Sequence, residues 1–370
     1  MAPSERMGAE RERDRATGSA PGTVPAPGVE PAPGAGTEPG AAPEPVTAPA
    51  PTSGLRMRVL MEPSHGATYD DIRALAQAVE GAGFEAFFRN DHLMGVDPED
   101  STYQPTEAWT TLAGLARDTR RVRLGALMGA ATFRAPGLLA AIVATVDQMS
   151  GGRVELGLGT GWYEREHAAF GLPFPPTAER FDRLEEQLAI ITGLWSTPPG
   201  DDKGFTFDGA HYRIDANRTP PRTAQTPHPP ILIGGTGPRR TPALAARYAD
   251  EFNTALGGDL RRRFAVFEQA CEAIGRDPGT VRRSSVLPVA CGSSRAEAES
   301  RAAVIGSDFI CREAAIGSPD AIIERLAELR EIGADTVYLH IYDIHDLDHI
   351  ALLGAEVLPH VASTPPGGIR

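Results

Sequence analysis

The sequence is poor in several features that mark particular classes of protein. It holds three cysteines in 370 residues, none in a CxxC pair, which favours reduced thiols over a disulfide framework. No stretch reaches the roughly 18 consecutive apolar residues of a membrane-spanning helix. Basic residues are outnumbered, and the formal net charge of −13 argues against nucleic acids and anionic membranes as partners. We therefore expect a cytoplasmic protein whose partners are neither nucleic acids nor membranes.

The first 54 residues lack every aromatic residue, leucine and isoleucine, yet they hold 11 of the 33 prolines. Such a segment cannot bury enough apolar surface to offset the entropy lost on ordering. We predict a disordered tail over 1–54, without the apolar run of a signal peptide, whose removal leaves stability unchanged. A short flexible end is expected at 363–370, which leaves 55–362 as the folded part.

The folded part alternates between strand-like and helix-like patterns. Strands are predicted at 55–61, 84–88, 122–128, 153–158, 230–233, 250–254, 284–290 and 335–341. Helices are predicted at 70–82, 106–118, 137–149, 178–195, 240–248, 259–274, 295–305 and 319–332. Because each parallel return needs a crossover, and no linker interrupts these residues, the pattern predicts an α/β fold with one closed (β/α)8 TIM barrel. The Pro/Gly-rich segment 197–229 is predicted to be a rim insertion carrying a small hairpin, FTFDGAHYRI.

Polar residues follow the second predicted strand directly, in the order Arg89, Asn90, Asp91 and His92. Functional side chains of such barrels gather at the C-terminal ends of the strands. A carboxylate next to a histidine at that place favours proton transfer over a purely structural histidine. Asp91 and His92 are therefore the candidate catalytic residues.

The fourth predicted strand ends in the stretch SGGRVELGLGTGW, with glycines at alternate positions 157, 159 and 161. Glycine weakens a strand, so it is typical of close backbone approach or unusual dihedral angles. We expect a flat or anionic group to lie against the bare amides there. The dinucleotide fingerprint G-x-G-x-x-G does not fit, because the third glycine is misplaced.

A second glycine-rich turn follows the fifth predicted strand, in PPILIGGTGPRRTPALAARYAD. Glycines in 234–237, the nearby Arg239 and Arg240, and a helix with Thr241 as its N-cap together favour a phosphate cradle. A plain turn with solvated arginines is an equally good alternative.

The stretch HIYDIHDLDH places His345 and His349 four residues apart, with Asp346 and Asp348 between them. This spacing imitates a metal site but lacks the glutamate of HExxH. We predict no metal there and a capped, solvated helix start instead.

Several longer stretches together resemble the luciferase-like monooxygenase superfamily and, within it, the deazaflavin (F420)-dependent oxidoreductases. They are GATYDDIRALAQAVEGAGFEAFFRNDH, ATFRAPGLLA, VDQMSGGRVELGLGTGWYEREHAAFGLPFPP, PPILIGGTGPRRTPALAARYADEFN and PDAIIERLAELREIGADTVYL. The resemblance is specific in order and spacing, and it covers roughly residues 57–256 and the last strand.

The resemblance implies a barrel with its cofactor at the C-terminal ends of the strands. It places the backbone of Thr160 and Gly161 beside the cofactor ring, and Asp91 and His92 close to the ring and the reacting carbon. It also implies a bulge at Leu127 and Met128, often with a non-prolyl cis peptide, that backs the ring. The cofactor phosphate is implied to lie on the second glycine-rich turn, at Gly235, Thr236 and Gly237.

The activity implied by the resemblance is hydride transfer between F420 and a small organic substrate. The alternatives are an FMN- or FMNH2-dependent monooxygenase and a protein that binds F420 or a small ligand without catalysis; a homodimer is compatible with each. Trp162 and Val96 depart from the sugar-phosphate dehydrogenases of this group, which carry Glu and Trp there. These departures argue against glucose 6-phosphate as substrate, and the sequence names no general acid besides His92.

Overall fold

The computed structural model describes residues 54–62, 67–95, 106–255 and 257–361. Apart from Gly54, the tail predicted over 1–54 lies outside these ranges, as do Val96 and the C-terminal end 363–370. Within the described part of the chain, no helix is both long and apolar enough to cross a bilayer.

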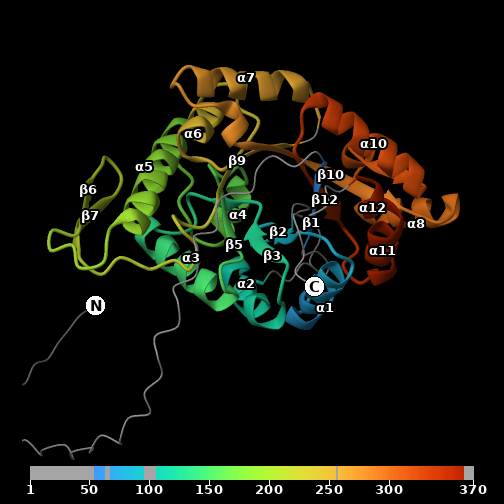
Figure 1. Ribbon diagram of the computed structural model, residues 1–370, viewed down its shortest axis with the longest axis horizontal. Helices are drawn as coiled ribbons and strands as arrows, with labels where there is room; N and C mark the ends of the chain where they lie inside the picture. Colours follow the sequence, from blue (N-terminus) through green and yellow to red (C-terminus); the bar gives the residue numbers. More distant parts are fainter. Residues whose placement is uncertain (1–53, 63–66, 96–105, 256, 362–370) are drawn as a thin grey trace, which may run out of the picture. The chain divides into compact units, whose positions relative to one another are not determined.

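Parallel strands close into a ring of eight, and helices surround it, which confirms the predicted (β/α)8 barrel (Figure 1). In ring order the strands are β1 (Arg56–Met61), β2 (Ala86–Arg89), β3 (Arg123–Ala126), β5 (Val154–Gly159), β8 (Ile231–Gly234), β9 (Glu251–Ala255), β10 (Arg282–Cys291) and β12 (Thr336–Ile341). The main helices are α1 (Tyr69–Gly81), α2 (Ala108–Asp118), α3 (Pro136–Ser150), α5 (Thr177–Ser196), α6 (Arg240–Tyr248), α7 (Leu260–Glu272) and α10 (Pro319–Ile332). The chain closes through α11 (Leu347–Leu352), a π-helical turn over Leu353–Val357 and α12 (Leu358–Val361).

Smaller elements lie outside the eight barrel strands and the main helices. They are β4 (Gly129–Ala130), α4 (Glu164–Ala169), β6 (Phe205–Asp208), β7 (Arg213–Asn217), a 3-10 turn over Pro278–Thr280, α8 (Arg295–Ile305), α9 (Asp308–Glu313) and β11 (Ala315–Gly317). Of these, β4, α4, the 3-10 turn, α9 and β11 were not expected from the sequence. Each is six residues or shorter, too short for its periodicity to stand out.

The first helix shows how local sequence sets the elements. Thr68 accepts a hydrogen bond from the N–H of Asp71, whose side chain accepts one from the N–H of Thr68, so a capping box starts α1. The buried residues of α1 recur at the three- and four-residue spacing of one helix face and are Ile72, Leu75, Ala76 and Val79. Capping and patterning therefore specify the same helix.

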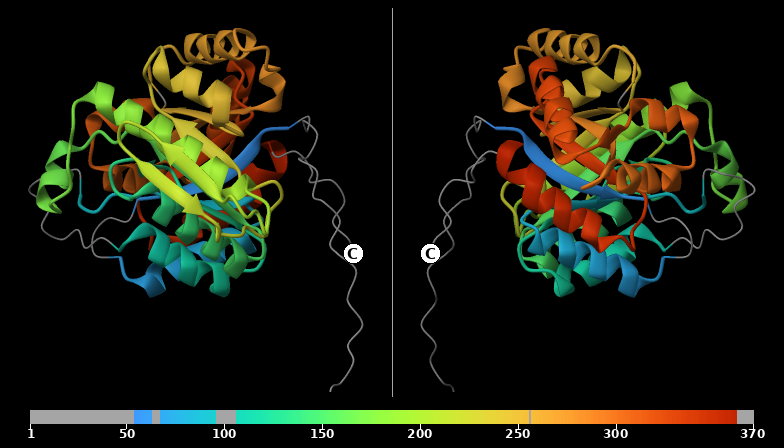
Figure 2. Two further views of the ribbon diagram at one scale, coloured as in Figure 1. Left: turned by 90° about the vertical axis from the view of Figure 1, so that its left-hand side faces the viewer. Right: turned by 90° about the vertical axis from the view of Figure 1, so that its right-hand side faces the viewer.

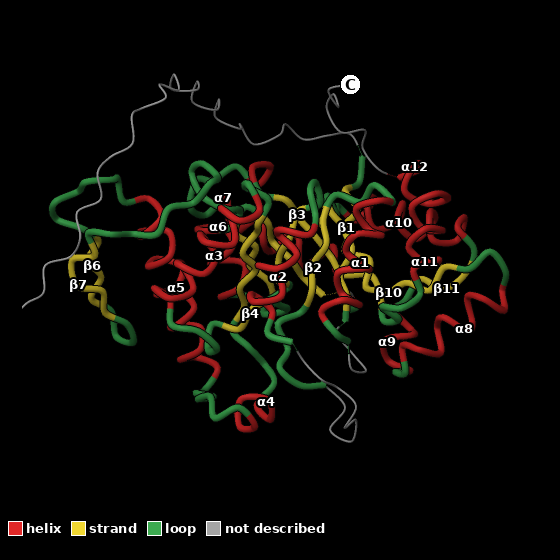
Figure 3. The backbone as a smooth tube through the Cα atoms, turned by 90° about the horizontal axis from the view of Figure 1, so that it is seen from below, coloured by secondary structure: helices red, strands yellow, loops and turns green. Residues whose placement is uncertain are grey.

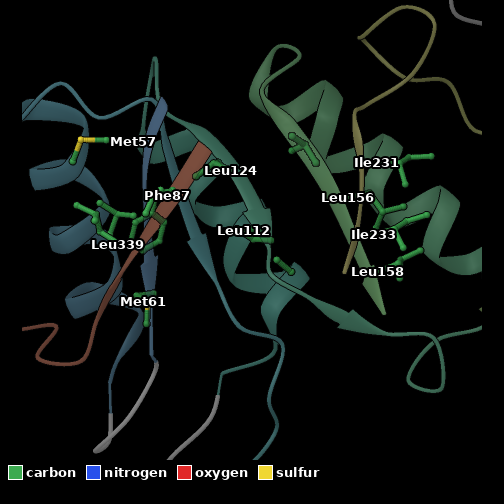
Figure 4. Close-up of a cluster of buried hydrophobic side chains, with 14 of the residues drawn as sticks. Met57, Met61, Phe87, Leu112, Leu124, Leu156, Leu158, Ile231, Ile233 and Leu339 are labelled. Atoms are coloured by element: carbon green, nitrogen blue, oxygen red, sulfur yellow. The ribbon is translucent and has the colours of Figure 1, made fainter. Parts of the chain in front are cut away.

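Alternate strand residues face the helices and the barrel interior, because successive side chains of a strand point to opposite sides. The outer set packs between barrel and helices and includes Met57, Phe87, Leu124, Leu156 and Ile233 (Figure 4). The inner set is smaller and comprises Leu60, Ala86, Phe88, Leu127, Leu232 and Tyr338. The apolar core is thus mainly a shell around the barrel.

At the N-terminal end of the strands the interior is charged. We call Arg58, Glu155, Glu251 and Tyr338 the barrel floor. Arg58 donates to Glu155 at 2.7 Å and to the Tyr338 hydroxyl at 2.9 Å, and Tyr338 donates to Glu251 at 2.8 Å. All are fully or almost fully buried, so these contacts replace the water that the charges lose.

The segment 197–229 forms the predicted hairpin, made of the antiparallel strands β6 and β7. Glu186 of α5 anchors its turn by accepting hydrogen bonds from the N–H groups of Ala210, His211 and Tyr212. The hairpin therefore packs on the outer side of α5 (Figure 2, left view).

Candidate functional site

Polar and aromatic side chains meet at the C-terminal ends of β1, β2 and β5. We call Glu62, Asn90, His92, Trp162 and Glu166 the barrel mouth. Parallel strands bring their C-terminal ends to one end of the barrel. The short helix α4, which carries Glu166, projects beyond that end (Figure 3).

His92 is held by a carboxylate that the sequence did not single out. Its Nδ1 lies 3.2 Å from both oxygens of Glu166, and the side chains are 20% and 2% exposed. Since a carboxylate only accepts, Nδ1 carries the proton in this contact. No hydrogen bond joins Nε2 of His92 to the described residues. Nε2 is therefore the atom available to a bound molecule.

The surroundings of His92 favour its charged form. Burial by itself lowers the pKa of His92, but the hydrogen bond and charge of Glu166 raise it, and Glu62 and Asp91 add to that rise. The net result is a pKa above the ordinary value for histidine. The imidazole is thus suited to hold a proton at Nε2 near neutral pH.

Glu166 also shapes the loop that follows His92. One of its oxygens accepts from the N–H of Leu93 at 2.5 Å and of Met94 at 3.2 Å. The sequence signal was available in WYEREHAAF, where acidic residues and a histidine follow the GTG turn at once. It was ambiguous because the pattern does not reveal which side of the short helix α4 faces His92.

The neighbouring His167 attaches α4 to the loop after β4. Its Nδ1 donates to the carbonyl of Tyr163 at 2.7 Å, and its Nε2 accepts from the Thr132 hydroxyl at 2.6 Å. Its ring packs between Phe133 and Phe174. Both nitrogens are engaged, so His167 supports the position of Glu166.

Asp91, the other candidate catalytic residue, is buried and paired. Arg134 donates to its two oxygens at 2.5 and 2.9 Å, and also pairs with Glu107. Burial raises the pKa of Asp91, while the Arg134 guanidinium opposes the rise. The structure thus assigns this carboxylate a partner that the sequence did not name, Arg134.

The predicted bulge is present after β3. The peptide bond between Leu127 and Met128 is cis and non-prolyl, and β4 follows immediately. The predicted continuous strand 122–128 is therefore corrected to β3 over 123–126, the bulge and β4. The sulfur of Met128 lies over the ends of β5 and β8, 3.1 Å from where a Cβ on Gly159 would stand.

The alternate glycines of β5 are explained in part by the chain itself. A Cβ at Gly157 would lie 2.2 Å from the Ala126 carbonyl oxygen, and one at Gly234 would lie 2.0 Å from the Met128 methyl group. Gly161 has a φ of +76°, which favours glycine. The chain around the bulge thus approaches Gly157 and Gly159, in addition to the flat or anionic group that we expect against the amides there.

Beyond β5 the chain turns through Thr160 and Gly161 into an exposed aromatic pair. Trp162 is 61% exposed, stacks on Tyr163 at 5.1 Å, and meets the His92 ring edge-on at 5.5 Å. A large exposed indole beside a half-buried imidazole marks this side of the mouth as a surface for contact.

The second glycine-rich turn joins β8 to α6. Gly235 has a φ of +149°, and Thr236 is exposed. The predicted N-cap is wrong: Arg239 holds that position without a side-chain cap, and Thr241 is buried, with its hydroxyl facing Gly235 and Gly237. The first N–H groups of α6 therefore lack a capping side chain.

The two arginines at this turn differ in environment. Arg240 lies 2.7 Å from Asp182 and 3.6 Å from Glu185, both on α5. Arg239 is exposed, and its side chain makes no hydrogen bond or ion pair with the described residues. Of the two arginines, only Arg239 is therefore free to add its positive charge to the N-terminus of α6.

A cavity of about 210 Å³ opens beside the loop that follows His92. Apolar side chains of Leu93, Phe133, Phe170 and Leu172 wall it, together with Arg134 and Glu107, which pair with each other. The cavity thus offers apolar contact beside the loop that begins at Leu93.

The histidines near the last helix behave differently from each other. Asp346 caps α11 as predicted, accepting from the N–H of His349. His349 is buried and accepts from the N–H of Cys291 at 3.0 Å, which corrects the prediction that it is solvated. No group of metal-binding side chains was found among the residues that the structure describes.

Known proteins share this architecture. The family described as luciferase-like monooxygenase matches residues 54–313. A coenzyme F420-dependent tetrahydromethanopterin reductase from Methanopyrus kandleri covers 84% of this chain and all of its own, with a TM-score of 0.69 at 19% identity. An F420-dependent secondary alcohol dehydrogenase, solved with an F420-acetone adduct, gives a TM-score of 0.71 at 20% identity over 84% of this chain and 99% of its own. At these identities the likeness concerns the fold alone.

Curated relatives fall into two cofactor groups. An F420-dependent glucose-6-phosphate dehydrogenase from Nakamurella multipartita is 36% identical over 188 residues, 50% of this chain and 52% of the relative. An F420-dependent hydroxymycolic acid dehydrogenase from Mycobacterium tuberculosis is 33% identical over 233 residues, 62% and 61% of the two chains. The matches thus span about half to three-fifths of these relatives.

An FMNH(2)-dependent dimethylsulfone monooxygenase from Pseudomonas putida is 26% identical over 327 residues, 78% of this chain and 87% of the relative. Relatives at this distance include both F420-dependent dehydrogenases and flavin-dependent monooxygenases. With the barrel, the bulge and the family match over residues 54–313, the chain belongs to the luciferase-like monooxygenase family of oxidoreductases and monooxygenases.

Proposed function

We propose that the protein is an F420-dependent oxidoreductase that moves a hydride between the deazaflavin and a small organic substrate. The observation that carries this proposal is His92, whose Nδ1 is held by Glu166 while Nε2 makes no hydrogen bond with the described residues. Bound F420 supplies the carbon that accepts or donates the hydride. The barrel then has to position the substrate and manage one proton.

The residues present fit such a cofactor. The uncapped start of α6, the exposed Arg239 and the left-handed backbone of Gly235 suit a phosphate held by backbone amides. Gly235, Thr236 and Gly237 would hold the phosphate. Leu127, Met128, Thr160 and Gly161 would line the ring, and buried Asp91 would support the bulge, since its carboxylate lies 3.1 Å from where a Cβ on Gly129 would stand.

In this proposal His92 is the proton-transfer residue and Glu166 orients it. When an alcohol is oxidised, its C–H bond yields the hydride and its O–H proton passes to Nε2 of His92. In the reverse direction Nε2 returns that proton to the carbonyl oxygen. The raised pKa of His92 favours the protonated form and so the reductive direction at the lower end of the neutral range.

The substrate is proposed to be small and largely apolar. Trp162 stands where the resemblance has a glutamate, and the cavity beside Leu93 is walled by apolar side chains. Within that cavity Arg134 is already paired with Glu107 and Asp91. A sugar phosphate would meet no unpaired cation among these residues, so glucose 6-phosphate is not proposed.

The second candidate is an FMNH2-dependent monooxygenase. It is supported by the relative from Pseudomonas putida, which aligns over more of this chain than the F420-dependent relatives do. Both cofactors carry a tricyclic ring and a phosphate, so the same loops would serve either. A protein that binds one of them without catalysis is the remaining alternative.

Titration of the full-length protein with F420, FMN and their reduced forms, followed by fluorescence quenching, tests the proposal. We expect saturable binding of F420 in preference to FMN, and reduction of F420 by small alcohols. Preference for FMN, with oxygen consumption when FMNH2 is supplied, would establish the monooxygenase instead. Tight F420 binding without hydride exchange across a panel of alcohols and ketones would point to the binding protein.

A further inference from the structure

The turn between β8 and α6 holds backbone donors that the protein itself does not use. From Thr236 to Thr241, no backbone N–H group donates to a described residue. Pairing resumes on either side of this run, because Gly235 before it and Ala243 after it both donate to carbonyl oxygens at 3.2 Å. The unpaired N–H groups are therefore confined to the turn and the first residues of α6.

Thr241 adds a side-chain donor to the same turn. The residue is only 3% exposed, and its hydroxyl makes no hydrogen bond with the described residues. The hydroxyl oxygen lies 3.2 Å from where a Cβ on Gly235 would stand and 3.4 Å from where one on Gly237 would stand. It does not belong to the fully enclosed polar atoms that lack a partner, so it keeps some accessible surface. A buried threonine thus directs a free hydroxyl at the glycine-rich turn.

Other threonines in helices of this chain are satisfied by their own helix. The hydroxyls of Thr111, Thr145 and Thr192 each donate at 2.8 Å to the carbonyl four residues earlier. The corresponding carbonyl for Thr241 is that of Gly237, which precedes the start of α6 at Arg240, and the structure has no hydrogen bond between these two described residues. Because a polar group removed from water costs free energy unless it is paired, an acceptor from outside the chain would stabilise this hydroxyl.

We propose that Thr241 is a binding residue for the cofactor phosphate, and that its hydroxyl donates to one phosphate oxygen while the backbone N–H groups of the turn hold the others. The phosphate is that of F420 or FMN, so this role rests on the proposed function. The role differs from that predicted from the sequence, which was the N-cap of α6. It adds a side-chain donor to the backbone cradle of Gly235, Thr236 and Gly237.

The charges at the turn suit an anionic acceptor. Helix α6 has no acidic residue in its first turn, and its N-terminus carries a partial positive charge. Arg239 is exposed and makes no ion pair with the described residues, whereas Arg240 is paired with Asp182 at 2.7 Å. A hydroxyl also donates more strongly to a charged oxygen than to a neutral one. The turn therefore favours a phosphate oxygen over water as the partner of Thr241.

The simpler alternative is that Thr241 only fills the space against the two glycines. Its methyl group also faces Gly235, 3.4 Å from where a Cβ would stand. In that case a valine of the same shape would serve equally well, and the affinity contributed by the phosphate would not change. The two alternatives therefore differ in a quantity that binding measurements give directly.

The experiment measures how much the phosphate adds to cofactor affinity in the full-length protein. Fluorescence quenching gives the dissociation constants of FMN and riboflavin, and those of F420 and its phosphate-free chromophore. Within each pair, the ratio of the two constants is the contribution of the phosphate. Thr241→Val removes the hydroxyl and keeps the shape, whereas Thr241→Ser keeps the hydroxyl.

We expect Thr241→Val to reduce this ratio by about tenfold, because a hydrogen bond to a charged group is lost. Thr241→Ser should retain most of the ratio. Thr145→Val is the matched control, since it removes an exposed threonine hydroxyl from α3 and should leave the ratio unchanged.

A Thr241→Val protein that melts as the wild type does and keeps the full ratio would overturn the proposal. If Thr241→Val is unstable, Thr241→Ala with an unchanged ratio does the same. Equal losses for the phosphate-bearing and phosphate-free compounds also count against it, because the hydroxyl would then support the turn and not the phosphate. A preference for FMN, or F420 binding without hydride exchange, would contradict the proposed activity but leave the ratio measurable, so the two proposals fail separately.

Discussion

The floor and the mouth of the same barrel use charge in opposite ways. On the floor, Arg58 contacts Glu155 and Tyr338, and the flanking Arg123 and Arg282 pair with Glu155 and Glu251. In the mouth, Nε2 of His92 makes no hydrogen bond with the described residues. Paired charges on the floor stabilise the fold, whereas Nε2 of His92 in the mouth is open to a substrate.

The same contrast appears in proton affinity. Burial raises the pKa of Glu155, but Arg58, Arg123 and Arg282 lower it well below its usual range. Glu155 on the floor therefore keeps its charge at physiological pH. In the mouth, carboxylates raise the pKa of His92 from its ordinary value. The charge of His92 therefore changes near neutral pH.

The largest expected effect is on turnover, at the mouth. His92→Ala should keep the fold and most of the cofactor affinity, while turnover falls by about 10²–10⁴-fold, the range for loss of a general acid or base. Steady-state kinetics beside a thermal melt test this, with exposed His345→Ala as the control. Near-normal turnover at saturating cofactor would refute the catalytic role.

The next effect is on stability, at the floor. Glu155→Gln leaves Arg58 and Arg123 without their shared carboxylate, and breaking such a buried network costs about 3–5 kcal/mol of unfolding free energy. Urea unfolding should show this loss. Glu179→Gln, which removes a half-buried pair with Arg183 on the outside of α5, should change the unfolding free energy by less than about 1 kcal/mol. If cofactor affinity per folded molecule also fell, floor and mouth would not be independent.

A third test compares two histidines whose pKa values are shifted in opposite directions. Burial and Arg301 lower the pKa of His349 to about 4, whereas the pKa of His92 is raised. Between pH 6.5 and 4 the unfolded chain binds a proton that folded His349 does not, so stability should fall as the pH falls through this window. His349→Gln should remove on the order of 2–3 kcal/mol of that pH dependence between pH 7 and 4.5.

Thermal melts of wild type and variant at the two pH values give this difference. His92 works in the other direction, since its raised pKa stabilises the fold below about pH 6.5, and that contribution is lost as the pH rises through the folded value. An unchanged pH dependence in His349→Gln would show that folding does not lower the pKa of His349.

The smallest expected effect concerns the phosphate loop. Gly235→Val places a branched side chain at a φ of +149°, with Thr241 3.2 Å from the new Cβ, and should weaken F420 binding by about tenfold. Gly275→Val is the matched control, because it places the same side chain at a φ of +72° outside this turn, with nothing within 4 Å of the new Cβ, and it should leave F420 binding unchanged. Equal losses for F420 and for its phosphate-free chromophore would mean that the loop holds no phosphate.

The sequence predicted several residues of the candidate site, but it did not predict which residues they contact. Strand ends predicted His92 and Asp91, and the resemblance implied the bulge at Leu127 and Met128. Glu166 was missed because it lies 74 residues from His92, on a helix too short to show a face. The pairing of Asp91 with Arg134 spans 43 residues, and no local pattern encodes it.

The amino-acid sequence by itself determined the order of strands and helices, because hydrophobic period and capping are local properties. Only the tertiary structure decided which glycines face the bulge, since that depends on how β3 meets β5 across the barrel. It also decided that Asp91 is paired while Nε2 of His92 is not. These outcomes depend on contacts between distant segments, where packing geometry and the loss of water set each group's proton affinity.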